Sequence, residues 1–245
     1  MRVRDLLDVL APPRCRACGA ANAPPLCGGC VAAVRWRPPG DHAPPPGSGL
    51  SRCVTLLWLE EPAADWIHRF KYPRPGVSGL DGTVRALGRE LAGRLAARLD
   101  PRPGDRVVAI PLHRHRLRER GFNPAAVIAR EAFAGSPARL APGLLERVRD
   151  TPSQAGLGRR ARLRNVEGAF RGRLGSGPRP SRVWLVDDVV TTGATLAAAA
   201  AALRAAGVGE VIGVGLARTP VSPLSAEGWK GGGGAAAIRS DRPLV

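Results

Sequence analysis

Two adjacent carboxylates followed by a hydroxyl-rich turn form the stretch of this sequence that is richest in chemistry. Asp187 and Asp188 end an apolar run that begins at Val183, and an alanine-rich helix is predicted over Leu196–Ala206. In an open α/β sheet, ligands bind at such carboxyl ends of strands. The turn that leads into the helix contains Thr191, Thr192, Gly193, Ala194 and Thr195.

The two halves of this stretch suit two different parts of a sugar phosphate. Backbone N–H groups at the start of a helix attract anions, and threonine hydroxyls add hydrogen-bond donors. Two carboxylates repel a phosphate, but they suit the hydroxyls of a ribose or a divalent metal. The alternative is an ordinary strand–helix turn, in which the threonines cap the helix and the aspartates are solvated. A P-loop nucleotidase is not supported, because the chain contains no G-x-x-x-x-G-K-[ST] motif.

A second anion site is predicted where arginines and histidines follow another strand. The strand Arg106–Ile110 leads into the block PLHRHRLRERGFN, which spans Pro111–Asn123. We expect this block to form a loop at the same sheet edge as the two carboxylates. After it, Asn123 is predicted to cap a helix over Ala125–Ala134, with Pro124 at the first helical position. The alternative is a solvated basic loop without a ligand.

The cysteines form a pattern that is typical of metal ligands. Two C-x2-C pairs are separated by eight residues, and they consist of Cys15, Cys18, Cys27 and Cys30. Each pair places two sulfurs on one tight turn, and two pairs supply the four tetrahedral ligands of a structural zinc. The alternatives are disulfides, which a cytosolic setting disfavours, free thiols, or a rubredoxin-like iron. Cys53 lies outside the pattern and is expected in the core.

Length and charge restrict the class of protein. The 245 residues fit one α/β domain with a small appendage, and the formal charge of +17 comes almost entirely from arginine. This charge favours anionic partners, either nucleic acid or polyphosphate metabolites. No apolar run approaches the ~20 residues of a membrane span. Met1–Leu10 is predicted to be a short amphipathic helix and not a signal peptide, so we expect no membrane insertion and a cytoplasmic location.

Local patterns divide the chain into four parts. We predict a zinc module over residues 1–37, a Pro/Gly linker over 38–50, the main domain over 51–220 and a disordered tail over 221–245. The main domain is expected to contain the strands Cys53–Leu59 and Val211–Ala217 and the helices Ala63–Tyr72 and Thr83–Leu99. The arginine-rich segment Arg147–Phe170 is predicted to be a mobile lid over a phosphate site, or else a plain surface excursion.

The stretch Val183–Thr195 closely resembles the phosphoribosyl-diphosphate (PRPP) binding signature of type I phosphoribosyltransferases. The double C-x2-C, the block PLHRHRLRERGFN and the segment RDTPSQAGLGRRARLRNVEGAF accompany it in the same chain. This ordered set resembles the ComF family of competence-associated, phosphoribosyltransferase-like proteins, over about Leu6–Ala217. One departure is Pro124, where the family pattern predicts a glutamine after Gly-Phe-Asn.

The resemblance implies a fold class and a role for each site residue. The fold would be α/β and type I phosphoribosyltransferase-like, a twisted parallel sheet flanked by helices, with a small N-terminal zinc-binding module. Asp187 and Asp188 would hold the ribose hydroxyls as the catalytic pair, and Thr191–Thr195 would hold the 5′-phosphate. PRPP would bind together with Mg²⁺. Pyrophosphate would lie on the turn and the arginines of the basic block, namely Pro111, Leu112, His113, Arg114, Arg116 and Arg120. The cysteine pairs match the family's zinc positions, and the helix with Phe70, Lys71 and Tyr72 would border the acceptor side.

Two hypotheses about function follow. The first is a PRPP-dependent phosphoribosyltransferase-like protein, with an unassigned acceptor and a role in DNA uptake or natural transformation. The second is a non-catalytic competence protein that binds single-stranded DNA, with PRPP only as a regulatory ligand. The second has few aromatic residues for base stacking, since the chain holds five Trp, four Phe and one Tyr.

Overall fold

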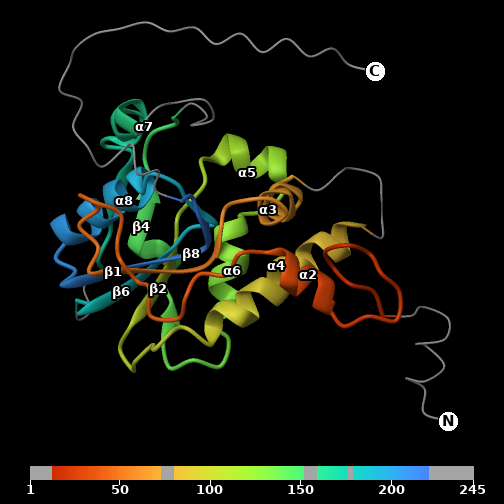
Figure 1. The fold of residues 1–245 in the computed structure, drawn as a ribbon. Coiled ribbons are helices and arrows are strands. Elements are labelled where there is room, and N and C mark those ends of the chain that lie inside the picture. The colour runs from red at the N-terminus through yellow and green to blue at the C-terminus, as the bar shows by residue number, and fades with distance from the viewer. Residues whose placement is uncertain (1–12, 73–79, 152–158, 176–178, 221–245) are drawn as a thin grey trace, which may run out of the picture.

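The computed structural model describes residues 13–72, 80–151, 159–175 and 179–220 (Figure 1). The helix predicted over Met1–Leu10 and the disordered tail predicted from Val221 lie outside these residues. None of the helices in the described part of the chain has both the length and the apolar character needed to cross a bilayer.

A parallel sheet forms the centre of the molecule. Its strand order is β1-β8-β6-β2-β3, and every pairing along that path is parallel. The strands are β1 (Arg52–Trp58), β2 (Arg106–Ala109), β3 (Arg139–Leu140), β6 (Arg182–Val186) and β8 (Glu210–Arg218). A further short strand, β7 (Val189–Val190), also pairs with β8. The predicted mixed α/β class with a parallel sheet is confirmed.

Helices cover both faces of this sheet, as Figure 1 shows for α4 and α6 on one side and α8 on the other. The first layer contains α3 (Ala63–Lys71), α4 (Leu80–Ala96) and α6 (Pro124–Ala132); the second contains α7 (Arg159–Val166) and α8 (Ala194–Ala205). Alternate residues of a strand point to opposite faces. Accordingly, Trp184 packs in the first layer, whereas Val183 and Leu185 pack in the second. Such double coverage explains why the central strands are apolar throughout.

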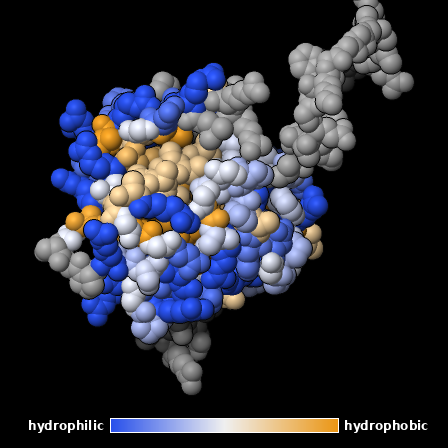
Figure 2. Space-filling model, turned by 90° about the vertical axis from the view of Figure 1, so that its left-hand side faces the viewer, coloured by the Kyte–Doolittle hydropathy of each residue, from blue (hydrophilic) through white to orange (hydrophobic). Residues whose placement is uncertain are grey.

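The alanine-rich sequence of α8 suits its position at the surface of the molecule. Leu196 and Leu203 are buried against the sheet, whereas Ala201 and Ala205 are exposed. This side of the molecule faces the viewer in Figure 2, where a pale apolar patch is framed by hydrophilic side chains. Gly207, with a φ of 100°, follows the end of the helix as predicted.

The basic block is a helix and not the predicted loop. Residues Arg114–Arg120 form α5, so the loop prediction was wrong there. The His113 side chain accepts a hydrogen bond from the His115 N–H and caps the first turn, and Gly121 ends the helix in the left-handed conformation with a φ of 71°. Arginine, leucine and glutamate have high helix propensities, which also favours a helix over this segment. The predicted cap of α6 is confirmed, because Asn123 Oδ1 accepts the Ala125 N–H at 3.1 Å.

Residues 38–49, which we call the strap, lie within the predicted Pro/Gly linker 38–50 and contain no helix or strand. The strap is nevertheless held along its length. The His42 carbonyl accepts the Cys53 N–H at 2.7 Å, the Ala43 carbonyl accepts Arg218, and the Gly49 carbonyl accepts Arg204 at 2.7 Å. The buried Pro45 lies against the loop before α8. The strap is therefore packed onto the domain over the edge strand β1.

The segment predicted to be a lid contains regular structure at both ends. The strands β4 (Leu145–Arg147) and β5 (Phe170–Gly172) pair antiparallel, and α7 precedes β5. Arg149 donates hydrogen bonds to the carbonyls of Asn165, at 3.1 Å, and Glu167, at 2.5 Å. Residues 152–158 lie outside the described part of the chain, so a lid motion stays a prediction.

Candidate functional site

The acidic pair lies where β6 ends, at the carboxyl edge of the sheet. The Asp187 N–H donates to the Val214 carbonyl at 2.9 Å, and Asp187 Oδ1 accepts the Asp188 N–H at 2.9 Å. The chain then pairs with β8 again through β7 and turns into α8 at Gly193. The sequence of strand, acidic pair, threonine turn and helix is therefore present as predicted.

Gly193 allows the sharp turn into α8. Its φ of 76° lies in the left-handed region, which glycine adopts without strain. A Cβ at this position would lie 2.5 Å from Pro45 Cβ, so the strap leaves no room for a side chain. The conformation of the turn thus depends on a glycine and on a residue far away in the sequence.

A cavity of about 160 Å³ joins the acidic pair to part of the basic block. Its lining comprises Ile110, Leu112, Arg116, Arg120, Arg147, Thr151, Asp187, Asp188, Val189, Thr191 and Thr195. A small adjoining hollow is lined by Gly193 and Ala194 at the start of α8. Thr192 lines neither, and its hydroxyl accepts the Ala194 N–H at 3.4 Å. The tertiary structure therefore places carboxylates, hydroxyls and guanidinium groups around one space.

Three arginines form the basic side of the cavity. Arg116, Arg120 and Arg147 form no ion pair with any carboxylate in the part of the chain that is described. Arg147 instead donates to Thr151 Oγ1 and lies over the Phe170 ring at 5.4 Å. Burial lowers the pKa of Arg147, and the positive charge of Arg116 lowers it further, while the carboxylates of Asp150 and Asp187 act in the opposite direction. An anionic ligand would relieve this repulsion.

The acidic side is asymmetric. Lys71 Nζ, at the end of α3, lies 3.0 Å from Asp188 Oδ1. Burial raises the pKa of Asp187 to about 7, and the Asp188 carboxylate acts in the same direction, while Lys71 and Arg147 oppose it. Asp188 is thus the paired carboxylate, and Asp187 is able to accept or hold a proton near neutral pH.

Other predicted pyrophosphate residues lie elsewhere. Pro111, His113 and Arg114 line a neighbouring groove beside α5, and Leu112 and Arg147 border both spaces. His113 Nδ1 also lies 2.9 Å from Asp150 Oδ2. Arg120 donates to the Tyr72 hydroxyl at 2.6 Å, which links the basic block to α3.

Two polar residues of the cavity were absent from the predicted site, as were the apolar residues Ile110 and Val189. Arg147 and Thr151 belong to the predicted lid segment, but no role was assigned to either side chain. The sequence showed only that the segment is polar and rich in arginine, and no pattern in it distinguished one arginine from the others. The strands β4 and β5 are each only three residues long. Strands of this length are too short to show a recognisable alternation of apolar and polar residues.

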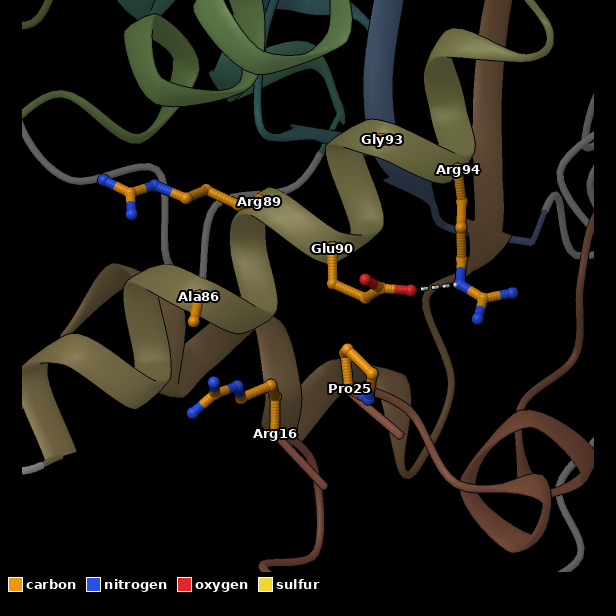
Figure 3. A pocket seen from close by; sticks show the side chains of 7 residues that line it. All are labelled: Arg16, Pro25, Ala86, Arg89, Glu90, Gly93 and Arg94. Carbon is orange, nitrogen blue, oxygen red and sulfur yellow. Dashed lines mark hydrogen bonds and ion pairs between the residues drawn. The ribbon is translucent and has the colours of Figure 1, made fainter. Parts of the chain in front are cut away.

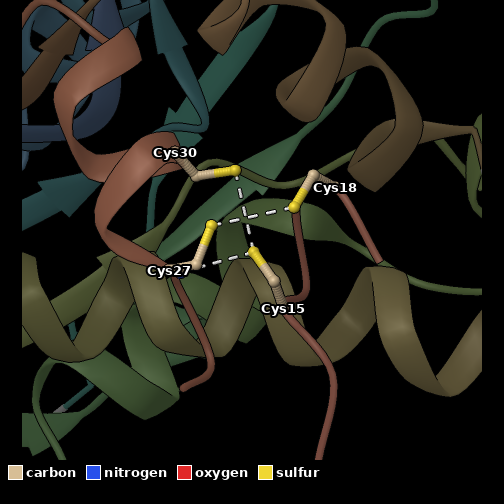
Figure 4. A group of neighbouring side chains, drawn as sticks. All are labelled: Cys15, Cys18, Cys27 and Cys30. Atoms are coloured by element: carbon tan, nitrogen blue, oxygen red, sulfur yellow. Dashed lines mark hydrogen bonds between the residues drawn. The ribbon is translucent and has the colours of Figure 1, made fainter. Parts of the chain in front are cut away.

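The four cysteines of the double C-x2-C form a compact cluster, with their sulfurs directed at a common centre (Figure 4). The Sγ atoms of Cys15 and Cys30 are 3.7 Å apart, and so are those of Cys18 and Cys27. Four sulfurs bound tetrahedrally to zinc at about 2.3 Å would be separated by about 3.8 Å. A disulfide needs about 2.0 Å between its sulfurs, so these distances fit a metal such as zinc and not disulfides.

Thiol ionisation in the cluster also favours a cation. Burial alone would raise the pKa of Cys15, but the backbone N–H groups of Cys18 and Cys27 outweigh it and lower the pKa to about 6. Burial and the neighbouring thiols raise the pKa of Cys30. All four groups can ionise together only when a positive charge lies among them. Cys53 is fully buried outside this cluster, as predicted.

The cysteine module packs on α3 and α4. Leu26 and Val34 belong to the same hydrophobic cluster as the residues of these helices, and Arg69 donates to the Ala17 carbonyl at 3.1 Å. A hollow of about 430 Å³ lies at this junction. Figure 3 shows Arg16 and Pro25 facing α4 across it. Arg94 and Glu90 of α4 already form an ion pair there at 2.9 Å.

Comparison with known proteins identifies the family. No family model matches the chain. "Competence protein F" of Haemophilus influenzae is 33% identical over 212 residues, which cover 79% of this chain and 90% of that protein. "DNA utilization protein YhgH" is 31% identical over 186 residues in Escherichia coli O6:H1, covering 75% of this chain and 74% of the relative. The protein of the same name from Salmonella typhi is 31% identical over 187 residues, covering 70% and 81%. The chain therefore belongs to the ComF family, as the order of its motifs predicts.

Proposed function

We propose that this chain binds Mg²⁺-PRPP in the cavity beside Asp187 and acts as a phosphoribosyltransferase-like protein in DNA uptake. The observation that carries the proposal is that one cavity combines an acidic pair, a threonine turn at a helix N-terminus and three arginines without acidic partners. These are the groups that a ribose, a monophosphate and a pyrophosphate need. The cytoplasmic location is part of the same proposal.

Each part of the cavity has a separate role in this proposal. Asp187 and Asp188 accept hydrogen bonds from the ribose hydroxyls, and the N–H groups at the start of α8 hold the 5′-phosphate. Arg116, Arg120 and Arg147 hold the pyrophosphate and stabilise the charge that it acquires as its bond to the sugar carbon breaks. Bound Mg²⁺ would neutralise phosphate oxygens, and carboxylates are the hard ligands that this ion prefers. An acceptor nucleophile then forms the new bond to that carbon.

Isothermal titration with PRPP in the presence of Mg²⁺ tests the proposal. Each hydrogen bond to a charged group contributes about 1.5–3 kcal/mol, so Arg147→Met should weaken binding by about tenfold or more. Arg118→Ala is the matched control, because Arg118 is exposed on the same helix as Arg116 and lines neither the cavity nor the groove beside α5. Absence of PRPP binding to the wild-type chain, or equal loss in both variants, would refute the assignment.

We further propose that the cysteine cluster holds a structural zinc. The support is the sulfur geometry and the sharing of one hydrophobic cluster with α3 and α4. Metal analysis of the purified protein should find zinc in a one-to-one ratio, and iron in its place would contradict this choice.

A second candidate function is single-stranded DNA binding with PRPP only as a regulator. It is favoured by exposed arginines without acidic partners among the described residues, including Arg114, Arg118 and Arg171. The names of the relatives refer to competence and DNA utilization. Affinity for a labelled oligothymidine should fall steeply with added salt, and a flat salt dependence would contradict phosphate contacts. A mobility-shift assay of the Cys15→Ser variant tests whether the cysteine module itself binds DNA or has only a structural role.

A further inference from the structure

A groove of about 800 Å³ lies between α5 and the paired strands β4 and β5, next to the proposed PRPP cavity, with which it shares Leu112 and Arg147. Arg116 and Arg120, which are four residues apart on α5, line the cavity, whereas Arg114 and Leu117 line the groove. Positions four apart lie on one helix face, so one face of α5 lines the cavity and another lines the groove. The groove is thus a second hollow, and its residues Arg114 and Leu117 do not line the cavity.

The groove has an apolar floor that is open to solvent. Leu117 is 43% exposed and Val148 is 42% exposed, and they are two of the four large hydrophobic side chains that are exposed in the described part of the chain. Both side chains line the groove, so a ligand bound there would cover exposed apolar surface. The lining contains no Phe, Tyr or Trp side chain, and its one ring that could stack on a base is the His113 imidazole. Nucleic-acid bases bind chiefly by stacking on aromatic rings, so the floor suits aliphatic side chains better than bases.

The rim of the groove is strongly basic. Arg114 and Arg171 are exposed and have no acidic partner among the described residues. Glu146 is the one carboxylate in the lining, and it pairs with Arg173 at 3.3 Å. The guanidinium groups of Arg114 and Arg171 therefore remain available for carboxylates of a ligand.

We propose that this groove binds an acidic, aliphatic-rich peptide segment of a partner protein. Carboxylates of the segment pair with Arg114 and Arg171, and its leucine or isoleucine side chains cover Leu117 and Val148. Arginine clusters recognise acidic motifs in this way, and the volume accommodates a few residues of extended chain. The proposal does not depend on PRPP binding.

Fluorescence anisotropy with the full chain tests this, using a short fluorescein-labelled peptide in which aspartates alternate with leucines. The wild-type chain should bind it, and Arg171→Glu should weaken binding by about tenfold. Leu117→Ser should also weaken it, with circular dichroism confirming that the variant is folded. Arg118→Glu is the matched control, because it reverses an exposed charge on α5 outside the groove and should leave the affinity within about twofold.

Three results would overturn the proposal. One is an equal loss of affinity in Arg118→Glu and Arg171→Glu, which would indicate unspecific attraction by the overall charge. Another is unchanged binding of a peptide with serine in place of every leucine, which would show that the apolar floor does not contribute to binding. The third is failure to bind the peptide while oligothymidine binds and is weakened by Arg171→Glu, which would assign the groove to nucleic acid.

Discussion

Replacing Gly193 by alanine should damage the protein through two separable effects. The first is backbone strain, because a φ of 76° costs a residue with a Cβ about 1–2 kcal/mol. The second is overlap, because the new Cβ would lie 2.5 Å from Pro45 Cβ and 2.6 Å from its Cγ. Overpacking of this kind costs about 1–3 kcal/mol. The total loss in the free energy of unfolding is then about 2–5 kcal/mol.

A double-mutant cycle separates the two effects. Pro45→Gly removes both overlapping carbons, so in that background Gly193→Ala should cost only the backbone strain of about 1–2 kcal/mol. Pro45→Ala is the control, because it retains the Cβ that is 2.5 Å away and should relieve much less. Urea unfolding of the four proteins of the cycle and of the alanine controls gives the coupling energy.

The same variants report on the phosphate turn. Under the proposed function, Gly193→Ala should weaken PRPP binding in titration calorimetry, because the N–H groups at the start of α8 would no longer point at the phosphate. Adding Pro45→Gly should restore part of the affinity. Additive losses within about 0.5 kcal/mol would show that Pro45 does not restrict Gly193, and the reasoning would be refuted.

Three further predictions follow from other groups in the structure. Burial holds the pKa of Asp187 at about 7, above its ordinary value of 3.8, so the folded chain keeps a proton that the unfolded chain releases, and stability should fall as pH rises through this interval. Urea midpoints on either side of the interval should show this fall, and Asp187→Asn should abolish it. Cys18→Ser should lose bound metal and lower the melting temperature, whereas Cys53→Ala should keep the metal because Cys53 lies outside the cluster; metal retention by Cys18→Ser would count against the four-sulfur site. Asp105→Ala should cost about 3–5 kcal/mol in urea unfolding, because it leaves the buried Arg182, now 2.6 Å from Asp105, without its counter-charge; a loss below about 1 kcal/mol would contradict this.

Local sequence determined the elements and several parts of the site. The run from Val183 through the acidic pair to α8 is contiguous, so the strand, the turn and the helix N-terminus could be predicted from their periods and their glycine. The cysteine spacing likewise predicted the cluster, because each pair occupies one turn. The helix α5 was missed, because the charge pattern of the block suggested solvent exposure while its residues favour a helix.

The tertiary structure alone decided which side chains meet. The pairing of Lys71 with Asp188 and the position of Arg147 in the cavity depend on how helices and the paired strands β4 and β5 pack around the sheet edge. Sequence periods carry no information about such distant neighbours. The contact of Pro45 with Gly193 arises because the strap returns across the edge strand to the start of α8. The division of the arginines of α5 between the cavity and the groove required the orientation of that helix. Local sequence thus encodes the chemical groups at the ends of the strands, whereas long-range packing selects the groups that act together.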